Sequence, residues 1–206
     1  MTILSKNDQK GRSMVEMLGV LAIIGVLSVG GISGYSKAMA KFKLTKAQDQ
    51  ISMLLMNVRT AFATSPSYKG LNNASSVAFA IAPGDMFSGD AIPTSYGKGQ
   101  LAQLNNAFGG GAHVYSCADE DREKECYTGT GSTTTKSDQY FAISLDNLGR
   151  EACVSLASSD WGTDGLISIR VGSSTYGTDK LPINMIEAGK ACGSYGARTA
   201  ITWTYY

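Results

Sequence analysis

The stretch KGRSMVEMLGVLAIIGVLSVGGISGYSK, from Lys10 to Lys37, decides the architecture of this chain. From Met14 to Ile32 its residues are apolar or small, except for Glu16 and Ser28. These roughly 19 residues are enough to cross most of a bilayer as a helix that rises about 1.5 Å per residue. The basic residues in front of the run predict that the N-terminus stays in the cytoplasm and that the rest of the chain is exported.

Two interpretations of this segment compete. In the first it is a signal peptide, because Ala38-Met39-Ala40 matches the A-x-A cleavage pattern and cleavage there would release a mature chain. In the second the segment is retained and works in the mature protein. The apolar run is longer than the usual core of a signal peptide, and a signal peptide has no use for a carboxylate such as Glu16 at its cytoplasmic edge. Both observations favour retention.

A helical pattern that continues beyond the apolar run favours retention more strongly. Apolar residues recur at three- and four-residue steps, and nothing between Lys37 and Ala63 interrupts them before Pro66. We therefore expect one helix from Met14 to Ala63, about 75 Å long, whose first half faces lipid or other apolar helices and whose second half presents one apolar stripe to a globular domain. The stripe consists of Leu44, Ala47, Ile51, Leu54, Leu55, Val58 and Phe62, with Lys41, Lys46, Gln50 and Asn57 largely elsewhere around the helix.

Glycines punctuate the apolar half of this expected helix. Gly30 and Gly34 form the G-x-x-x-G spacing that allows close approach of two helices. Each glycine also weakens a helix by roughly 1 kcal/mol relative to alanine. We expect this region to pack tightly against other helices, or to unwind locally, in the assembled protein.

The composition bounds what the remainder can be. With 206 residues, a formal net charge of +1 and 24 glycines, the chain suits one loop-rich domain with an appendage and offers no argument for nucleic acid as a partner. Four cysteines, an even number behind a membrane-directed segment, indicate two disulfides formed in an oxidising compartment. No C-x-x-C pair supports a zinc or redox centre.

The pattern beyond Pro66 predicts an α+β domain with a mainly antiparallel sheet. We interpret residues 67–111 as a long connection with one short helix near Ala74 to Ala82. Alternation predicts strands over Tyr140 to Leu145, Leu166 to Val171 and Thr199 to Tyr205, the last half-buried because Ile201, Trp203 and Tyr205 alternate with threonines. Helices are expected from Leu148 to Ser158, opened by Asp146 or Asn147, and from Pro182 to Cys192, with Pro182 in the first turn and Gly193 just after the end.

Motifs of catalysis are weak throughout the chain. The single histidine, His113, has no G-x-S-x-G motif to accompany it, and in a predicted strand it is expected to be structural. The stretch GTGSTTTK, Gly129 to Lys136, lacks the G-K-[ST] ending of a phosphate loop. The charged stretch Ala118 to Glu125 is interpreted as a solvated loop, with a contact to a receptor or between assembled copies as the alternative. We expect no catalytic residue, no cofactor and no metal.

The N-terminal motif resembles the processing site of type IV prepilins: Gly11, then Arg12-Ser13-Met14-Val15-Glu16, then an apolar run. Three later phrases resemble the type IVb class, which includes bundle-forming pilins and the thin pili of conjugative systems. They are NAFGGG from Asn106, EACVSLAS around Cys153 and EAGKAC ending at Cys192. Where the family usually has Phe, Met or Leu after the cut, this chain has Arg12, and the sequence leaves open whether its amine is methylated as in the family.

The resemblance implies a mechanism of assembly. A prepilin peptidase would cut after Gly11, and the new amine of Arg12 would meet Glu16 of a neighbouring subunit when the register of the helices is right. A charge within an apolar helix costs roughly 2.5–3.5 kcal/mol at the bilayer centre, so such a carboxylate is normally paired. Each subunit carries both halves of this contact on different surfaces, which generates an open helical filament. The resemblance also implies a Cys153–Cys192 disulfide, which leaves Cys117 and Cys126, close together in sequence, as the second pair.

These observations predict a leader over residues 1–11, a long helix over 12–64 and an exported pilin domain over 65–206. The resemblance implies a structural subunit of a type IVb pilus, inserted in the inner membrane of a Gram-negative cell and polymerised into an extracellular filament for adhesion, aggregation or conjugation. Its implied partners are further copies of itself, the prepilin peptidase, the assembly machinery of both membranes and a host or recipient-cell surface. The alternatives are a minor pilin or pseudopilin, and a secreted disulfide-bonded binding domain or enzyme released after Ala40.

Overall fold

The computed structural model describes residues 14–72, 81–82, 86–87, 104–117, 126, 137–162, 164–193 and 198–206. The chain divides into two compact units, Met1–Lys41 and Phe42–Tyr206. The expected short helix near Ala74 to Ala82 lies mostly outside the described residues. So do the stretches Gly129 to Lys136 and Ala118 to Glu125.

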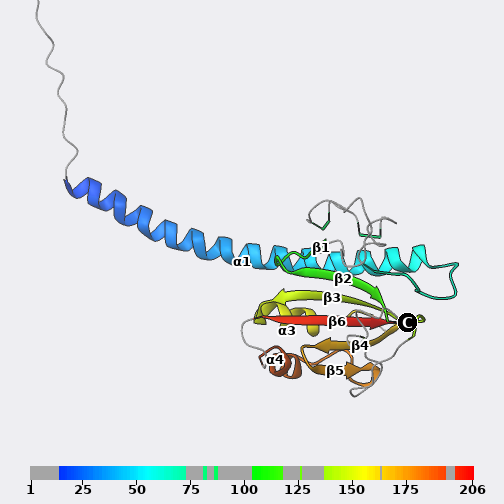
Figure 1. Cartoon of the computed structure of the whole chain (residues 1–206). Coiled ribbons are helices and arrows are strands. Elements are labelled where there is room, and N and C mark those ends of the chain that lie inside the picture. Colours follow the sequence, from blue (N-terminus) through cyan, green and yellow to red (C-terminus); the bar gives the residue numbers. More distant parts are fainter. Residues whose placement is uncertain are drawn as a thin grey trace, which may run out of the picture. The chain divides into compact units, whose positions relative to one another are not determined.

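The long helix predicted from the sequence is present as α1, Met14–Ala61, with 48 residues (Figure 1). The helix ends at Ala61, two residues before the expected end. One further backbone hydrogen bond joins the Phe62 N–H to the Val58 carbonyl oxygen, at 3.0 Å, and Pro66 prevents any continuation of the helix.

Within the described residues, six strands form one sheet in the order β1-β2-β3-β6-β4-β5, in which every neighbouring pair is antiparallel. The α+β class with an antiparallel sheet is therefore confirmed. β4 and β6 match their predictions, and β3 starts one residue later and ends three residues later than predicted. β1 lies within residues 67–111, which we interpreted as a connection, and β2 contains His113, which we expected in a strand; β5 was not predicted. The strands are β1 Leu104–Asn105, β2 Gly111–Ser116, β3 Phe141–Leu148, β4 Leu166–Val171, β5 Ser174–Gly177 and β6 Thr199–Tyr205.

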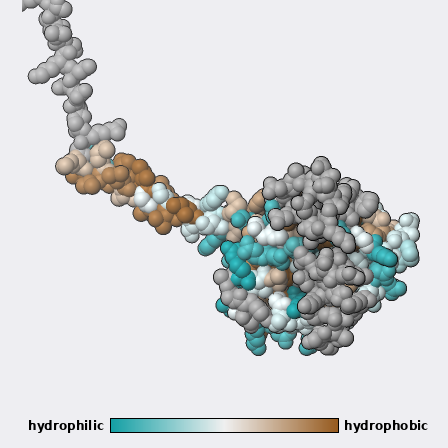
Figure 2. All heavy atoms as spheres, viewed as in Figure 1, coloured by the Kyte–Doolittle hydropathy of each residue, from teal (hydrophilic) through white to brown (hydrophobic). Residues whose placement is uncertain are grey.

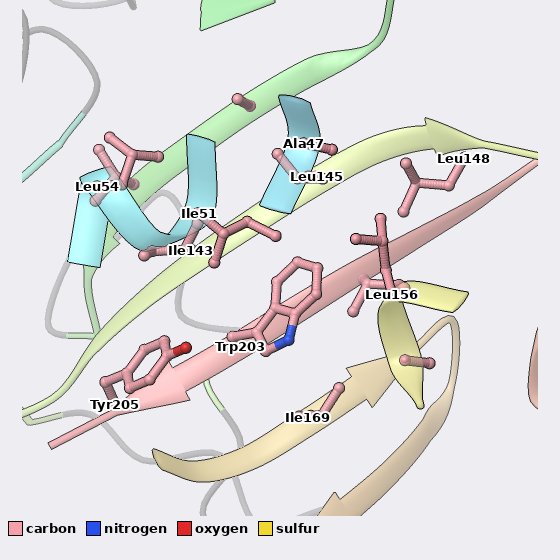
Figure 3. Close-up of a cluster of buried hydrophobic side chains, with 14 of the residues drawn as sticks. Ala47, Ile51, Leu54, Ile143, Leu145, Leu148, Leu156, Ile169, Trp203 and Tyr205 are labelled. Atoms are coloured by element: carbon pink, nitrogen blue, oxygen red, sulfur yellow. The ribbon is translucent and has the colours of Figure 1, made fainter. Parts of the chain in front are cut away.

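The core lies between one face of the sheet and the second half of α1. Ala47, Ile51 and Leu54 of α1 face Ile143, Leu145 and Trp203 of the sheet, and Leu156 of α3 (Arg150–Ala157) closes the cluster (Figure 3). The apolar stripe at helical spacing is thus confirmed as the packing face of this half of the helix.

The prediction that β6 is half-buried was wrong. Its threonines are enclosed as well: Thr199, Thr202 and Thr204 are all buried. The reason is position, because β6 lies between β3 and β4 and its short side chains are flanked by paired strands on both sides. The Thr202 hydroxyl donates to the Ser144 hydroxyl across the strands, at 3.3 Å.

Both later helices begin further along the chain than predicted. α3 starts at Arg150 with Gly149 as its N-cap, because Asp146 binds His113 and Asn147 adopts a positive φ of 61° within β3. α4 (Met185–Gly193) starts three residues after Pro182, which follows a cis peptide bond and a short 3-10 turn, η2 (Thr178–Lys180). Asn184 caps α4 instead, since its Oδ1 accepts the Glu187 N–H at 3.0 Å. Gly193 is the last residue of α4, where we expected it just after the end.

Candidate functional site: an exposed apolar helix and a disulfide-linked domain

The first half of α1 is apolar on every side, and no other described residue covers it. Its large apolar side chains keep between 48% (Met17) and 86% (Met14) of their surface exposed. Figure 2 shows their hydrophobic surface as a brown region over this part of the helix. A helix that is hydrophobic all round is stable only in lipid or among other apolar helices. By length and composition α1 is the one described helix able to cross a membrane.

Two features of this half suit an environment without water. The hydroxyls of Ser28 and Ser36 donate to the carbonyl oxygens of Ile24 and Ile32, four residues back, at 2.7 and 2.9 Å. Neither hydroxyl therefore needs a partner outside the helix. The helix is continuous through Gly30 and Gly34, and a Cβ added at either would meet nothing within 4 Å. An adjacent surface of small residues therefore stays open for a second helix.

Glu16 lies in the first turn of α1 and is exposed. A carboxylate is favourable there, because the helix dipole places partial positive charge at this end. Gly11 and Arg12, the predicted processing site, lie outside the described residues.

The second half of α1 is held by polar contacts that the sequence pattern did not predict. We placed Gln50 away from the stripe, and that was wrong: it is fully buried. Its Nε2 donates to the Met86 carbonyl oxygen, at 2.9 Å, and its Oε1 accepts the Ala107 N–H, at 3.1 Å. Further along α1, the side-chain amide of Asn57 donates to the Ile81 carbonyl oxygen, at 2.9 Å. The spacing was the missed signal, since Gln50 lies three residues after Ala47 and four before Leu54.

Asn106 holds together the turn between β1 and β2. Its Oδ1 accepts the N–H groups of Phe108 and Gly110, at 2.8 and 3.1 Å, and its amide donates to the Asp146 carbonyl oxygen, at 2.7 Å. A side chain at Gly110 would overlap that same carbonyl oxygen, so only glycine fits the turn. His113 lies in β2, and its Nε2 is 2.9 Å from Oδ2 of Asp146 in β3. His113 thus lies in a strand, as expected, and contacts a carboxylate there.

Two disulfides stabilise the unit Phe42–Tyr206. Cys153 of α3 is bonded to Cys192 of α4, and Cys117 is bonded to Cys126, so both expected pairs are present. All four cysteines are fully buried. The first bond ties the two helices to each other across 39 residues of chain, which fixes α4 beside the sheet. Among the described residues, no three His, Cys, Asp or Glu side chains are grouped to hold a metal.

A long helix whose apolar first half is uncovered, and whose second half packs on an antiparallel sheet, defines the class of type IV pilins. The chain belongs to the Bundlin family: the sequence model of that family matches residues 37–205. Among solved structures, the type IV b pilin from Salmonella typhi has a similar fold, with a TM-score of 0.53 and 19% identity over 80% of this chain and 98% of that one.

Two curated relatives are similar along most of the chain. The major structural subunit of bundle-forming pilus from Escherichia coli O111:H- is 23% identical, over 98% of this chain and 96% of its own length. The toxin coregulated pilin of Vibrio cholerae is 26% identical, over 81% of this chain and 65% of its own length.

Proposed function

We propose that this protein is a structural subunit of a type IVb pilus. The observation that carries the proposal is the first half of α1, which is apolar on all sides and exposed in the isolated chain. In the precursor this half is inserted in the inner membrane, and in the filament it packs among the same helices of other subunits. The disulfide-linked domain stays outside, and the filament serves adhesion, aggregation or conjugation. The proposal gives the chain no catalytic role.

Glu16 sets the register of assembly. A prepilin peptidase removes residues 1–11, and the freed amine of Arg12 lies four residues from Glu16 along the sequence. In a bundle of staggered helices, this amine neutralises Glu16 of a neighbouring subunit, and only one stagger allows the contact. The apolar faces supply affinity and the ion pair supplies specificity. The assembly machinery of the two membranes and a recipient or host surface complete the list of partners.

The test is the intact mass and N-terminal sequence of the protein in its mature form. A start at Arg12 supports the proposal, and a further methyl increment would show that the amine is methylated. A start at Lys41 contradicts it, because the apolar half and Glu16 would be gone together.

The competing interpretation, a secreted domain released after Ala40, draws support from one observation. The boundary between the two compact units falls after Lys41, one residue from that cleavage point. Against it, α1 continues without interruption through residues 38–40. The same mass measurement separates the two interpretations.

A further inference from the structure

The exported unit carries an open groove that no part of the described chain fills. It has a volume of about 720 Å³ and lies between the outer side of α1 and the turn that follows α3. Its apolar lining comes from Leu55 and Met56 of α1 and from Trp161 of the turn, and Arg59 and Asp160 add one charge of each sign.

The walls of this groove are fixed by contacts of their own. The Trp161 ring stands edge-on to Trp203, with centroids 5.2 Å apart, and its Nε1 donates to the Leu156 carbonyl oxygen at 2.9 Å. Gln48 Nε2 donates to the Ser159 hydroxyl at 3.1 Å and so joins α1 to the turn. A site that is already rigid loses little conformational entropy when it is filled.

The same unit carries an apolar projection that no other described residue covers. Met185 and Ile186, at the start of α4, keep 71% and 72% of their surface exposed, while Ala188, Ala191 and Cys192 of the same helix face the core. Among the described residues of this unit, they are the adjacent pair of large apolar side chains left in the open. Exposed neighbours of this kind mark contact surfaces more often than single exposed residues do.

We propose that the α4 projection, Met185 and Ile186, of one subunit inserts into the α1 groove of a second copy of this chain. α4 contacts α3 and β4 and lies towards the β5 side of the sheet, away from the second half of α1 (Figure 1). One copy therefore cannot fill its own groove. Projection and groove are different surfaces, so the contact is head-to-tail and repeats without closing. The inference rests on the proposed function, because it requires subunits gathered in a filament.

Charge complementarity favours a second copy over a lipid or a small apolar ligand. α4 carries Glu187 in its first turn and Lys190 in its last turn, and these charges are opposite in sign to those of Arg59 and Asp160 in the groove. The ion partner of Arg59 among the described residues is Asp164, at 3.6 Å, and that carboxylate is fully exposed. The ion pair itself contributes little, so a neighbour's carboxylate can replace it while the Arg59 guanidinium keeps its hydrogen bond to the Asp164 carbonyl oxygen and its place over the Tyr205 ring.

The test is cross-linking in assembled filaments of full-length chains that carry Met56→Cys together with Ile186→Cys. We expect mild oxidation or a short bis-maleimide to give trimers and higher multimers, since each copy links forwards and backwards. Each single variant should give dimers at most. The matched control pairs Ile186→Cys with Thr45→Cys, an exposed α1 position outside the groove, and should give no ladder.

Filaments that form without a ladder, or with the same ladder in the Thr45 control, would overturn the groove contact and leave the proposed function intact. Absence of filaments from the unaltered chain would instead refute the proposed function. If the double-cysteine variant forms no filaments, a pair of charged variants provides the test instead. Met56→Lys and Ile186→Glu should each lower filament yield about tenfold, equivalent to roughly 1.4 kcal/mol, and together should recover most of it. A double variant no better than the poorer single one overturns the contact.

Discussion

At the scale of single residues, Glu16 is the one ionisable side chain between Met14 and Ile32. It lies outside the unit Phe42–Tyr206, so it contributes nothing to the folding of that unit. Its cost within apolar surroundings has to be offset by a partner, and the described part of the isolated subunit supplies none beyond the end of the helix itself. The proposed function assigns that partner to the next subunit.

We therefore expect Glu16→Ala and the isosteric Glu16→Gln to leave the amount of subunit in the membrane fraction unchanged and to lower filament yield at least about tenfold, the effect of losing roughly 1.4 kcal/mol. The measurement is quantitative immunoblotting of membrane and sheared-filament fractions. Glu151→Ala, at an exposed position in the first turn of α3, is the control. Normal piliation of both Glu16 variants would remove the register argument.

Tyr205 offers a second test at this scale. Its hydroxyl is buried and has no hydrogen-bond partner among the described residues. Burial raises the pKa of Tyr205 far above its usual value, and Arg59, whose guanidinium lies 5.9 Å from the centroid of the ring, lowers it only in part. Because the folded-state pKa exceeds the unfolded one, the associated stability is complete below a pH of about 10 and is lost as the pH rises towards the folded-state pKa.

Tyr205→Phe should therefore leave the free energy of unfolding at pH 7 unchanged, or raise it by about 1 kcal/mol, since an unsatisfied polar atom is removed. Above a pH of about 10 the variant should resist alkaline unfolding better than the parent. Urea unfolding of the detergent-solubilised full chain at both pH values measures this, with Tyr206→Phe at an exposed position as the control. A loss of more than about 1 kcal/mol at pH 7 would mean that the hydroxyl has a partner.

Residue-scale prediction from sequence succeeds where one rule acts alone. Ala47, Ile51, Leu54 and Val58 were predicted as the packing face because apolar spacing is the rule that governs them. Gln50 shares their face and was missed because its polarity argued for solvent. Its partners come from segments 36 and 57 residues away, a separation that local patterns do not report.

At the scale of elements, the disulfide between α3 and α4 is a covalent link that holds α4 in place. The outer side of α4 is exposed, and its buried residues are small apart from the cysteine. In the chain-entropy model, a disulfide between cysteines 39 residues apart contributes about 4 kcal/mol to stability. The Cys117–Cys126 bond, between cysteines 9 residues apart, contributes about 3 kcal/mol.

Replacing both Cys153 and Cys192 by serine should thus lower subunit abundance outside the cytoplasm more than replacing both Cys117 and Cys126. Removing both members of a pair avoids a free thiol that could pair wrongly. Immunoblots of periplasmic and membrane fractions, with transcript levels held equal, provide the comparison. Equal abundance of the two double variants would show that loop length does not decide their contribution.

Element boundaries illustrate a different limit of sequence reasoning. The existence of α3 and α4 was predicted from periodicity and is confirmed, yet both first turns were misplaced. Asp146 is a good N-cap residue by type, but the tertiary contact with His113 uses its carboxylate, and Gly149 caps α3 instead. Asn184 is the N-cap of α4. The start of α4 was placed too early because proline is common in the first turn of helices, whereas Pro182 lies before this one.

At the scale of the whole molecule, two units with opposite requirements share one continuous helix. The unit Phe42–Tyr206 contains a core of its own, built from the second half of α1, the sheet and two disulfides. The described residues of the unit Met1–Lys41 contribute nothing to that core, and they expose a large apolar surface that is unfavourable in water. Folding is therefore assigned to the unit Phe42–Tyr206, whereas the uncovered apolar surface that the proposed function uses for assembly lies in the other unit.

A chain that begins at Phe42 should consequently be soluble without detergent when it is exported to an oxidising compartment, with both disulfides formed and a cooperative thermal transition. It retains Ala47, Ile51, Leu54 and Val58, so the packing face of α1 is intact, but it should form no filaments even at high concentration. Light scattering and circular dichroism measure size and stability, and the full-length chain in detergent is the control. A truncated chain that unfolds, or one that polymerises as the full-length chain does, would mean that the first half of α1 is not the separate assembly device that its exposed apolar surface indicates.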